Sequence, residues 1–166
     1  ETDIIREILR GYTNRLTSVY KLSSDDIYAH DTFLSYDMAK QQCKIMKDSI
    51  INIIKRQQRK GIPSIINGVH IVPEELYLST PFPNILYINL YIDSEKALWD
   101  RLSKRNPQKY KKEYVPFLYQ TNVDLNNSLY NIPKDLCIIH SINISNLSKQ
   151  ETLSKIDKIF RTIYTN

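Results

Sequence analysis

Three short polar segments of this 166-residue chain carry side chains that could do chemistry. The first runs from Thr2 to Glu7. Within it, Asp3 could orient or deprotonate a substrate hydroxyl, and Arg6 could pair with a phosphate or a carboxylate. A helix N-cap at Asp3, followed by a solvated Arg6 and Glu7, explains the same residues without function. The residue pattern alone leaves a substrate-binding role and a capping role open.

The second segment, Asn67-Gly-Val-His-Ile-Val-Pro73, ends a short apolar run. Gly68 at the end of a strand would allow a ligand or another backbone to approach closely. His70 is one of three histidines in the chain, and an imidazole that titrates near neutral pH suits proton transfer. A lone histidine in a strand is also commonly a structural residue, so both interpretations of His70 stay open.

The third segment runs from Asp93 to Arg105. Arg101 and Arg105 are four residues apart, so in a helix they share one face and could together hold an anionic group. A basic helix face that is simply solvated explains the same spacing.

Several catalytic and nucleotide-binding motifs are absent. The sequence contains no GxxxxGKS/T, GxGxxG or HExxH motif and no nucleophile elbow, and it has only three glycines. Because Gly11, Gly61 and Gly68 are far apart, they cannot form a glycine-rich phosphate loop. We therefore expect that this chain does not hold the phosphates of ATP in a P-loop.

The elements that must position these segments follow from apolar periodicity and capping residues. The pattern predicts helices over residues 3–10, 37–60 and 95–105, some helix around 114–129, and a last helix that opens with the capping box Ser148-Lys-Gln-Glu151 and buries Leu153, Ile156, Ile159, Phe160 and Ile163. It predicts buried strands over 64–72, 84–92 and 136–144. Continuous apolar strands between helices indicate an α/β fold with a parallel sheet, in which ligands bind beyond the carboxyl ends of the strands.

Composition sets broad limits on the class of protein. The length suits a single domain over residues 1–166, and no apolar run is long enough to cross a membrane, so we expect a cytoplasmic protein without a membrane partner. Cys43 and Cys137 are predicted to be reduced and largely buried. The formal net charge is +5, which suits a small anionic, phosphorylated substrate. The densest basic cluster is local, so nucleic-acid binding is not expected; it comprises Lys104, Arg105, Lys109, Lys111 and Lys112.

Together the three segments resemble motifs of the 2-phosphoglycerate kinase family, in the same order and with similar spacing. Thr2-Asp3-Ile-Ile-Arg6-Glu7-Ile-Leu-Arg10 is similar to the string that follows the P-loop in that family. Gly61-Ile-Pro-Ser-Ile-Ile-Asn67-Gly-Val-His70-Ile-Val-Pro73 is similar to its strand ending in Glu-Gly-Val-His-Leu-Val-Pro. Arg101-Leu-Ser-Lys-Arg105 resembles the RFxxR motif of its lid.

The resemblance implies a three-layer α/β/α fold of the P-loop kinase type, incomplete at its N-terminus, with a lid-like segment at about residues 95–130. It implies an ATP- and magnesium-dependent kinase that converts 2-phosphoglycerate to 2,3-bisphosphoglycerate, with the strand, P-loop and helix expected ahead of Glu1. By position, the resemblance places Asp3 and Arg6 at the substrate and His70 near the phosphates. It places Gly68 and Arg101 at the nucleotide, and gives Arg101 and Arg105 the role of neutralising the transferred phosphoryl group.

The chain also departs from the family pattern. Asn67 replaces a glutamate, Leu98 a histidine and Leu102 a phenylalanine, and residues 121–123 lack an expected arginine. Two other functions therefore remain open. One is a catalytically inactive kinase-fold domain that serves binding or regulation, and the other is a nucleoside or polynucleotide kinase of the same fold. A P-loop motif in the sequence ahead of Glu1 would favour a kinase.

Overall fold

The computed structural model describes residues 2, 4–5, 35–68, 71–77, 85–108, 110–133 and 137–164. By their internal contacts the residues group into two compact units, Glu1–Ser79 and Thr80–Asn166. Each unit is described by itself. The number of independently folding domains stays a prediction.

The first unit is built on one long helix, α4 (Tyr36–Lys60), followed by a short helix, α5 (Pro73–Tyr77). The hydroxyl of Ser35 accepts a hydrogen bond from the Met38 amide at 3.2 Å and begins α4. Gly61, with φ of 62°, ends it in the left-handed conformation. The predicted helix over 37–60 with Gly61 as its stop is therefore confirmed.

The buried face of α4 forms the core of this unit together with α5. Its buried residues recur at helical spacing, and they are Ala39, Gln42, Cys43, Met46, Ile50, Ile51 and Ile54. The Val72 amide donates to the Cys43 sulfur at 3.5 Å, just before α5 begins. Near the start of α4, Lys40 forms an ion pair with Glu74, which raises the pKa of the lysine. These contacts fix α5 against α4.

The predicted strand over 64–72 is wrong for its described residues. Residues 62–68 and 71–72 form no strand, and Ile65 is 95% exposed. A strand needs a neighbouring strand that bonds its backbone N–H and C=O groups in a ladder. Within the described residues no such ladder forms along this segment, and the Asn67 carbonyl accepts a single bond from the Thr2 amide. The apolar composition of this segment is typical of a strand, but composition does not show whether a partner strand is present.

The second unit contains a two-stranded parallel sheet, β1 (Leu86–Tyr91) and β2 (Ile138–Asn143). The register pairs Leu86 with Ile138 and Tyr91 with Asn143. Between the strands the chain forms α6 (Glu95–Arg105), a 3-10 turn η1 (Lys112–Tyr114), α7 (Val115–Ser128) and a second turn η2 (Leu129–Asn131). The strands predicted over 84–92 and 136–144, and the helices predicted over 95–105 and around 114–129, are confirmed, and so is an α/β fold.

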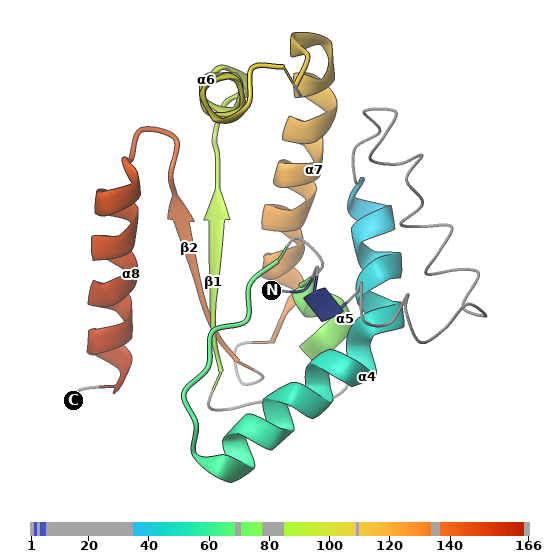
Figure 1. Ribbon diagram of the computed structural model, residues 1–166, viewed down its shortest axis with the longest axis vertical. Helices are drawn as coiled ribbons and strands as arrows, with labels where there is room; N and C mark the ends of the chain where they lie inside the picture. Colours follow the sequence, from blue (N-terminus) through green and yellow to red (C-terminus); the bar gives the residue numbers. More distant parts are fainter. Residues whose placement is uncertain are drawn as a thin grey trace. The chain divides into compact units, whose positions relative to one another are not determined.

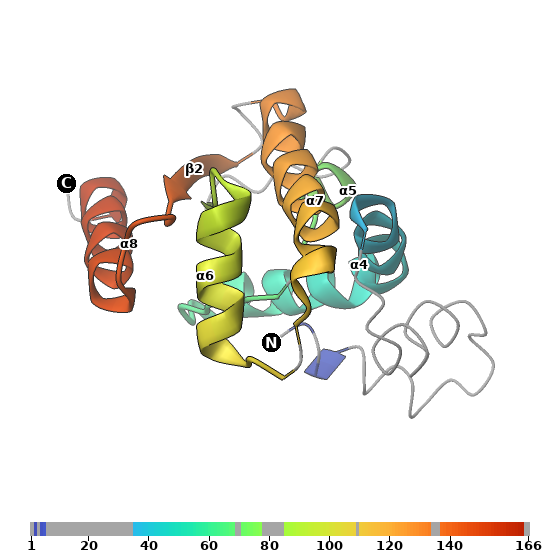
Figure 2. The same cartoon turned by 90° about the horizontal axis from the view of Figure 1, so that it is seen from above.

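Helix α7 packs against α6 and β1, and both strand ends point to the same edge of the sheet (Figures 1 and 2). The segment predicted to be lid-like, about residues 95–130, comprises α6, η1 and α7. Among the described residues, no helix is both long and apolar enough to span a bilayer.

The last helix, α8 (Lys149–Tyr164), begins with the predicted capping box. The Ser148 amide donates to Glu151 at 2.8 Å, and the Glu151 amide donates back to the Ser148 hydroxyl at 3.2 Å. The expected burial of its apolar face is only partly met, however. No α8 residue is fully buried; Ile156, Ile159 and Ile163 are half-buried, whereas Leu153 and Phe160 are 50% and 49% exposed. The amphipathic spacing predicted the helix correctly but not how completely its face is covered.

Core packing in the first unit gives a direct stability prediction. Ile50 is buried against the α4–α5 core, whereas Ile65 is almost fully exposed. Ile50→Ala should lower the free energy of unfolding by about 2–5 kcal/mol, because it leaves a cavity. The matched variant Ile65→Ala should change it by less than about 0.5 kcal/mol. Urea denaturation of both variants measures this, and equal effects would contradict the assignment of the core.

Cys43 gives a second prediction, on pH dependence. Both cysteines are buried and free, as predicted, and burial raises the pKa of Cys43 from 9.0 to about 11. The thiol ionises at a lower pH in the unfolded chain than in the folded one. The contribution of Cys43 to the free energy of unfolding is therefore complete below pH 9 and is lost as the pH rises towards 11. Urea denaturation from pH 8 to 11 should show a shallower decline for Cys43→Ala than for the unmodified chain. Parallel slopes would contradict the raised pKa.

Candidate functional site

The carboxyl ends of β1 and β2 are joined by a small polar network. Asp93, just after β1, accepts hydrogen bonds from the Ser145 hydroxyl and from the Asn143 amide, the latter at 2.6 Å. The Asp93 backbone amide donates in turn to the Ser145 hydroxyl at 2.9 Å. The hydrogen bonds from Ser145 and Asn143 lower the pKa of Asp93, so the carboxylate stays ionised at neutral pH. The network fixes the loops that follow the two strands.

Arg101 lies at the same edge, but its guanidinium is already engaged. One of its terminal nitrogens donates to the backbone carbonyls of Ile144 and Leu147, in the loop between β2 and α8. Its Nε is buried without a hydrogen-bond partner among the described residues. Arg101 therefore holds α6 to that loop. The helix face that it shares with Arg105 does form, but the two arginines are not equivalent, because Arg105 is exposed at the end of α6.

A shallow hollow of about 540 Å³ lies beside Arg101 at the carboxyl end of β1. Its lining combines an apolar floor with basic side chains: Ile92, Leu98, Leu102, Arg101, Lys104 and Arg105. Neither Lys104 nor Arg105 forms an ion pair within the described part of the chain. Apolar residues with free cations beside them suit a small ligand that carries a phosphate or carboxylate.

Helix α7 supplies polar side chains that the sequence analysis did not single out. The Asn122 side chain donates to the Ile92 carbonyl at 2.7 Å and accepts from the Ile92 amide at 3.2 Å. Asn89 donates to Asn126 at 2.9 Å, and the Tyr119 hydroxyl donates to the Asp93 carbonyl at 2.8 Å. Asn122 lies where the family resemblance leads one to expect an arginine. Its spacing of four from Asn126 was the available signal, since both face the same side of a helix.

In the first unit, two of the three predicted segments meet. The Thr2 amide donates to the Asn67 carbonyl at 2.9 Å, and Thr2 is fully buried. Gly68 has φ of 153°, and a Cβ placed on it would lie 1.6 Å from the Thr2 hydroxyl oxygen. The glycine is therefore required by a close approach of Thr2. The predicted role of Gly68 in letting a ligand approach is not tested by this contact.

Asp3, Arg6 and His70 lie outside the described residues, so their roles stay predictions. Asn67 is described, and its side chain is exposed while its backbone carbonyl holds Thr2. Thr2, which directly precedes Asp3, contacts Gly68, which lies two residues before His70.

The residues that the structure describes do not fit magnesium or the phosphates of ATP. No cluster of three or more His, Cys, Asp or Glu side chains able to hold a metal occurs among them. Gly61 ends α4 and Gly68 contacts Thr2, so neither belongs to a phosphate cradle. Both carboxylate oxygens of Asp93 already accept hydrogen bonds. ATP and magnesium would need other groups.

Comparisons with known proteins leave the family unassigned: no family model, no curated protein and no solved structure matches this chain.

The contact between Gly68 and Thr2 can be tested by a double-mutant cycle. Gly68→Ala should destabilise the first unit by roughly 2–4 kcal/mol, because it adds backbone strain and a clash. Gly61→Ala is the matched control, since Gly61 also has positive φ but nothing within 4 Å of an added Cβ; it should cost only about 1–2 kcal/mol.

The second half of the cycle isolates the clash. Thr2→Gly removes the atoms that an alanine at position 68 would meet, so the double variant should recover part of the loss. Urea denaturation measures all four proteins. Strict additivity would show that Thr2 and Gly68 are not in contact.

Proposed function

We propose that this chain is the substrate-binding part of a small-molecule kinase similar to 2-phosphoglycerate kinase, acting on a small phosphorylated acid. The observation that carries the proposal is the hollow at the carboxyl end of β1, where Lys104 and Arg105, which form no ion pair with the described residues, lie beside apolar Leu98 and Leu102. In parallel α/β sheets, this edge is where ligands bind.

Two further features support a phosphotransferase. The parallel pairing of β1 with β2 and the helical connection between them agree with the order of elements that the resemblance implies. In addition, the segments with the family-like Thr-Asp and Gly-Val-His strings contact each other through Thr2 and Gly68. Phosphoryl transfer depends mainly on positioning and positive charge, and both Arg105 and Lys104 supply charge without forming a described ion pair.

Within the proposal, the roles of the two arginines of α6 differ. Arg105 is the residue that contacts the anionic group of the substrate. Arg101 is a positioning residue, because its guanidinium holds the loop after β2. The P-loop, the adenosine phosphates and magnesium must be provided by groups other than the described ones, and ATP stays an implication of the resemblance.

A non-catalytic binding or regulatory domain is the second candidate. Asn67, in place of the family's glutamate, is exposed and carries no charge, so it can neither act as a base nor attract magnesium electrostatically. A domain of this kind would still bind an anion in the hollow but would transfer no phosphoryl group. A nucleoside or polynucleotide kinase has no separate observation in its favour.

The reaction itself is tested in a protein in which a P-loop precedes this chain. Incubation with Mg-ATP and 2-phosphoglycerate should yield 2,3-bisphosphoglycerate, and ³¹P NMR measures its formation. Binding of 2-phosphoglycerate without any transfer would favour the non-catalytic domain. The absence of both binding and transfer would reject both candidates.

Arg105→Ala provides the residue-level prediction. It should lower kcat/KM for the phosphorylated acid by roughly ten-fold or more, since hydrogen bonds to charged groups contribute about 1.5–3 kcal/mol. The melting temperature should hardly change, because Arg105 is exposed. Lys158→Ala, which removes an exposed cation from α8, is the matched control and should leave the kinetics as they were. Unchanged kinetics for Arg105→Ala would show that this arginine is a solvated residue that does not bind the substrate.

A further inference from the structure

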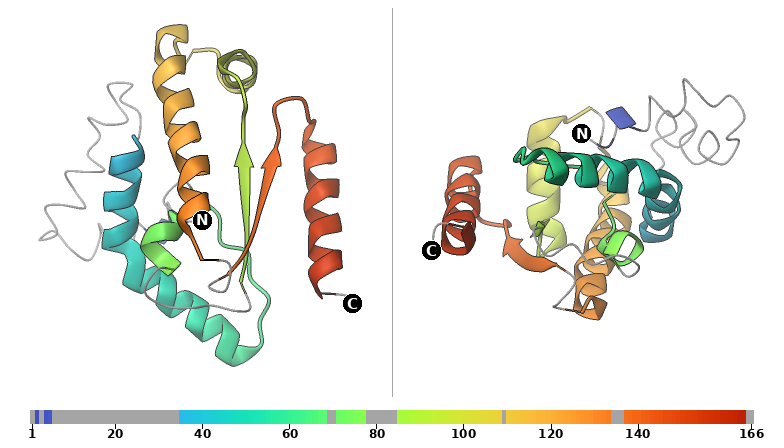
Figure 3. Two further views of the ribbon diagram at one scale, coloured as in Figure 1. Left: turned by 180° about the vertical axis from the view of Figure 1, so that it is seen from behind. Right: turned by 90° about the horizontal axis from the view of Figure 1, so that it is seen from below.

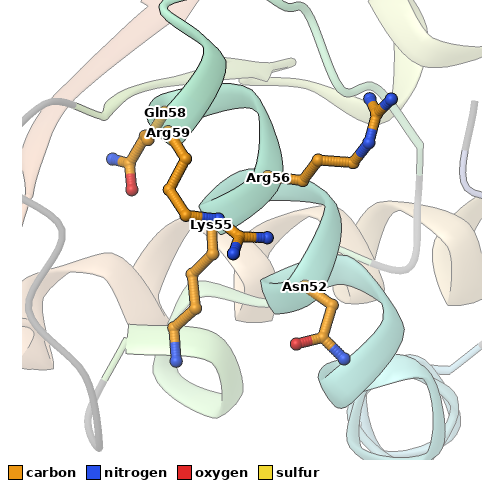
Figure 4. Close-up of a pocket in the computed structure, with 5 residues that line it drawn as sticks. All are labelled: Asn52, Lys55, Arg56, Gln58 and Arg59. Carbon is orange, nitrogen blue, oxygen red and sulfur yellow. The ribbon is translucent and has the colours of Figure 1, made fainter.

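The carboxyl-terminal half of α4 presents a basic surface that the proposed kinase reaction does not use. Its cations are Lys55, Arg56, Arg59 and Lys60, which all lie within six residues and are all exposed. Asn52 and Gln58 lie beside them on the helix. A hollow of about 580 Å³ is lined by Asn52, Lys55, Arg56, Gln58 and Arg59 (Figure 4). We call the set Asn52, Lys55, Arg56, Gln58, Arg59 and Lys60 the α4 basic surface.

The cations of this surface are not neutralised by nearby acids. From Ser49 to Pro73 the sequence contains no Asp or Glu, so neither the i−4 nor the i+4 positions of α4 can supply a partner. No salt bridge or hydrogen bond joins these four side chains to any group in the described ranges. Elsewhere the same unit does pair its charges, as Lys40 does with Glu74.

Stabilisation of the helix itself does not account for the set. Cations at a helix C-terminus offset its dipole, but that effect is confined to the last turn. Arg59 and Lys60 lie there, whereas Lys55 and Arg56 precede the last turn. The terminal carbonyls of Gln57 and Gln58 are already bonded by the amides of Ile62 and Gly61, at 3.0 and 3.1 Å.

No residue of the α4 basic surface takes part in the contact between Thr2 and Gly68. After Gly61 the chain leaves the end of α4 and continues without helix or strand over residues 62–68 (Figure 3). Loss of function at one place would therefore be distinguishable from loss at the other, and the inference does not rest on the proposed kinase activity.

We propose that the α4 basic surface binds the phosphodiester backbone of a nucleic acid. Arginine and lysine together with amide side chains are the groups that contact phosphate oxygens in such complexes. Residues 52 to 59 extend about 10 Å along the helix, and a duplex of that length carries about six phosphate charges.

No aromatic side chain belongs to the surface, so it contacts the backbone and does not stack on bases. The apolar face of α4 is buried in the core, which leaves this helix unable to insert into a bilayer.

The test measures binding of the full protein to a fluorescent 20-base-pair duplex of mixed sequence by anisotropy, over a range of salt concentrations. Four phosphate contacts predict that the logarithm of the affinity falls with the logarithm of salt with a slope of about −3.6. Lys55→Glu/Arg59→Glu should weaken binding at least ten-fold at low salt and make the slope shallower, with a magnitude of about 1.8 or below.

A matched control separates a local surface from overall charge. Lys96→Glu/Lys149→Glu changes the net charge by the same amount at two exposed lysines in the second unit, and it should bind the duplex nearly as well as the unmodified protein. Equal weakening by the two double variants would overturn the proposal, as would the absence of duplex binding at low salt. Tighter binding to vesicles of phosphatidylserine and phosphatidylcholine than to the duplex would also overturn it.

Discussion

The hydrogen bonds at the carboxyl ends of β1 and β2 are the constraint on which the second unit depends. A parallel pair requires a long connection, and here it includes two helices and two 3-10 turns. Closing such a connection costs chain entropy that two strands alone offset poorly. The bonds from the Ser145 hydroxyl to the Asp93 carboxylate and from Arg101 to the Ile144 carbonyl join the start of this connection to the loop after β2. At the same edge, Asn122 holds α7 to the end of β1 through both backbone groups of Ile92.

This constraint also determines which side chains remain for a ligand. A guanidinium that donates to two carbonyls in a partly buried place is committed, because breaking those bonds would leave a desolvated charge. Arg101 is therefore part of the scaffold, and one helical turn later Arg105 is exposed. Two arginines on the same face of one helix thus have different tasks. The difference comes from the β2–α8 loop, which follows them by some 40 residues.

The sequence predicted those elements whose signals are local. Gly61 and the box Ser148–Glu151 marked helix ends that the structure confirms, and the apolar runs around Leu86–Tyr91 and Ile138–Asn143 marked the paired strands. It failed where the outcome depends on a distant partner. Within the part of the chain that the structure describes, the apolar run at residues 64–68 pairs with no strand, and the apolar face of α8 is at most half-buried. Periodicity records that a segment is suited to burial, but burial itself requires a second surface.

The same distinction applies to the candidate site. The sequence singled out Asn67, Gly68 and Arg105, and it identified Arg101 as one of a pair, but it could not show that Gly68 is required by Thr2 or that Arg101 is occupied. Asn122 and Asn126 were missed because an asparagine in a helix has no motif, and its role appears only when the strand beside it is in place.

Charge shows the limit most clearly. A formal net charge of +5 favours anionic ligands in general, yet the physical question is which cations lack partners. Lys40 and Arg161 are paired with Glu74 and Asp157, and Arg101 is bound to carbonyls. Two groups of cations that form no ion pair in the described ranges are Lys104 with Arg105 at the end of α6, and the four cations of the α4 basic surface. The first set adjoins apolar residues and suits a small ligand, whereas the second adjoins only polar side chains and suits an extended polyanion. The partners of each cation, and not the net charge, therefore decide which kind of anion a basic segment suits.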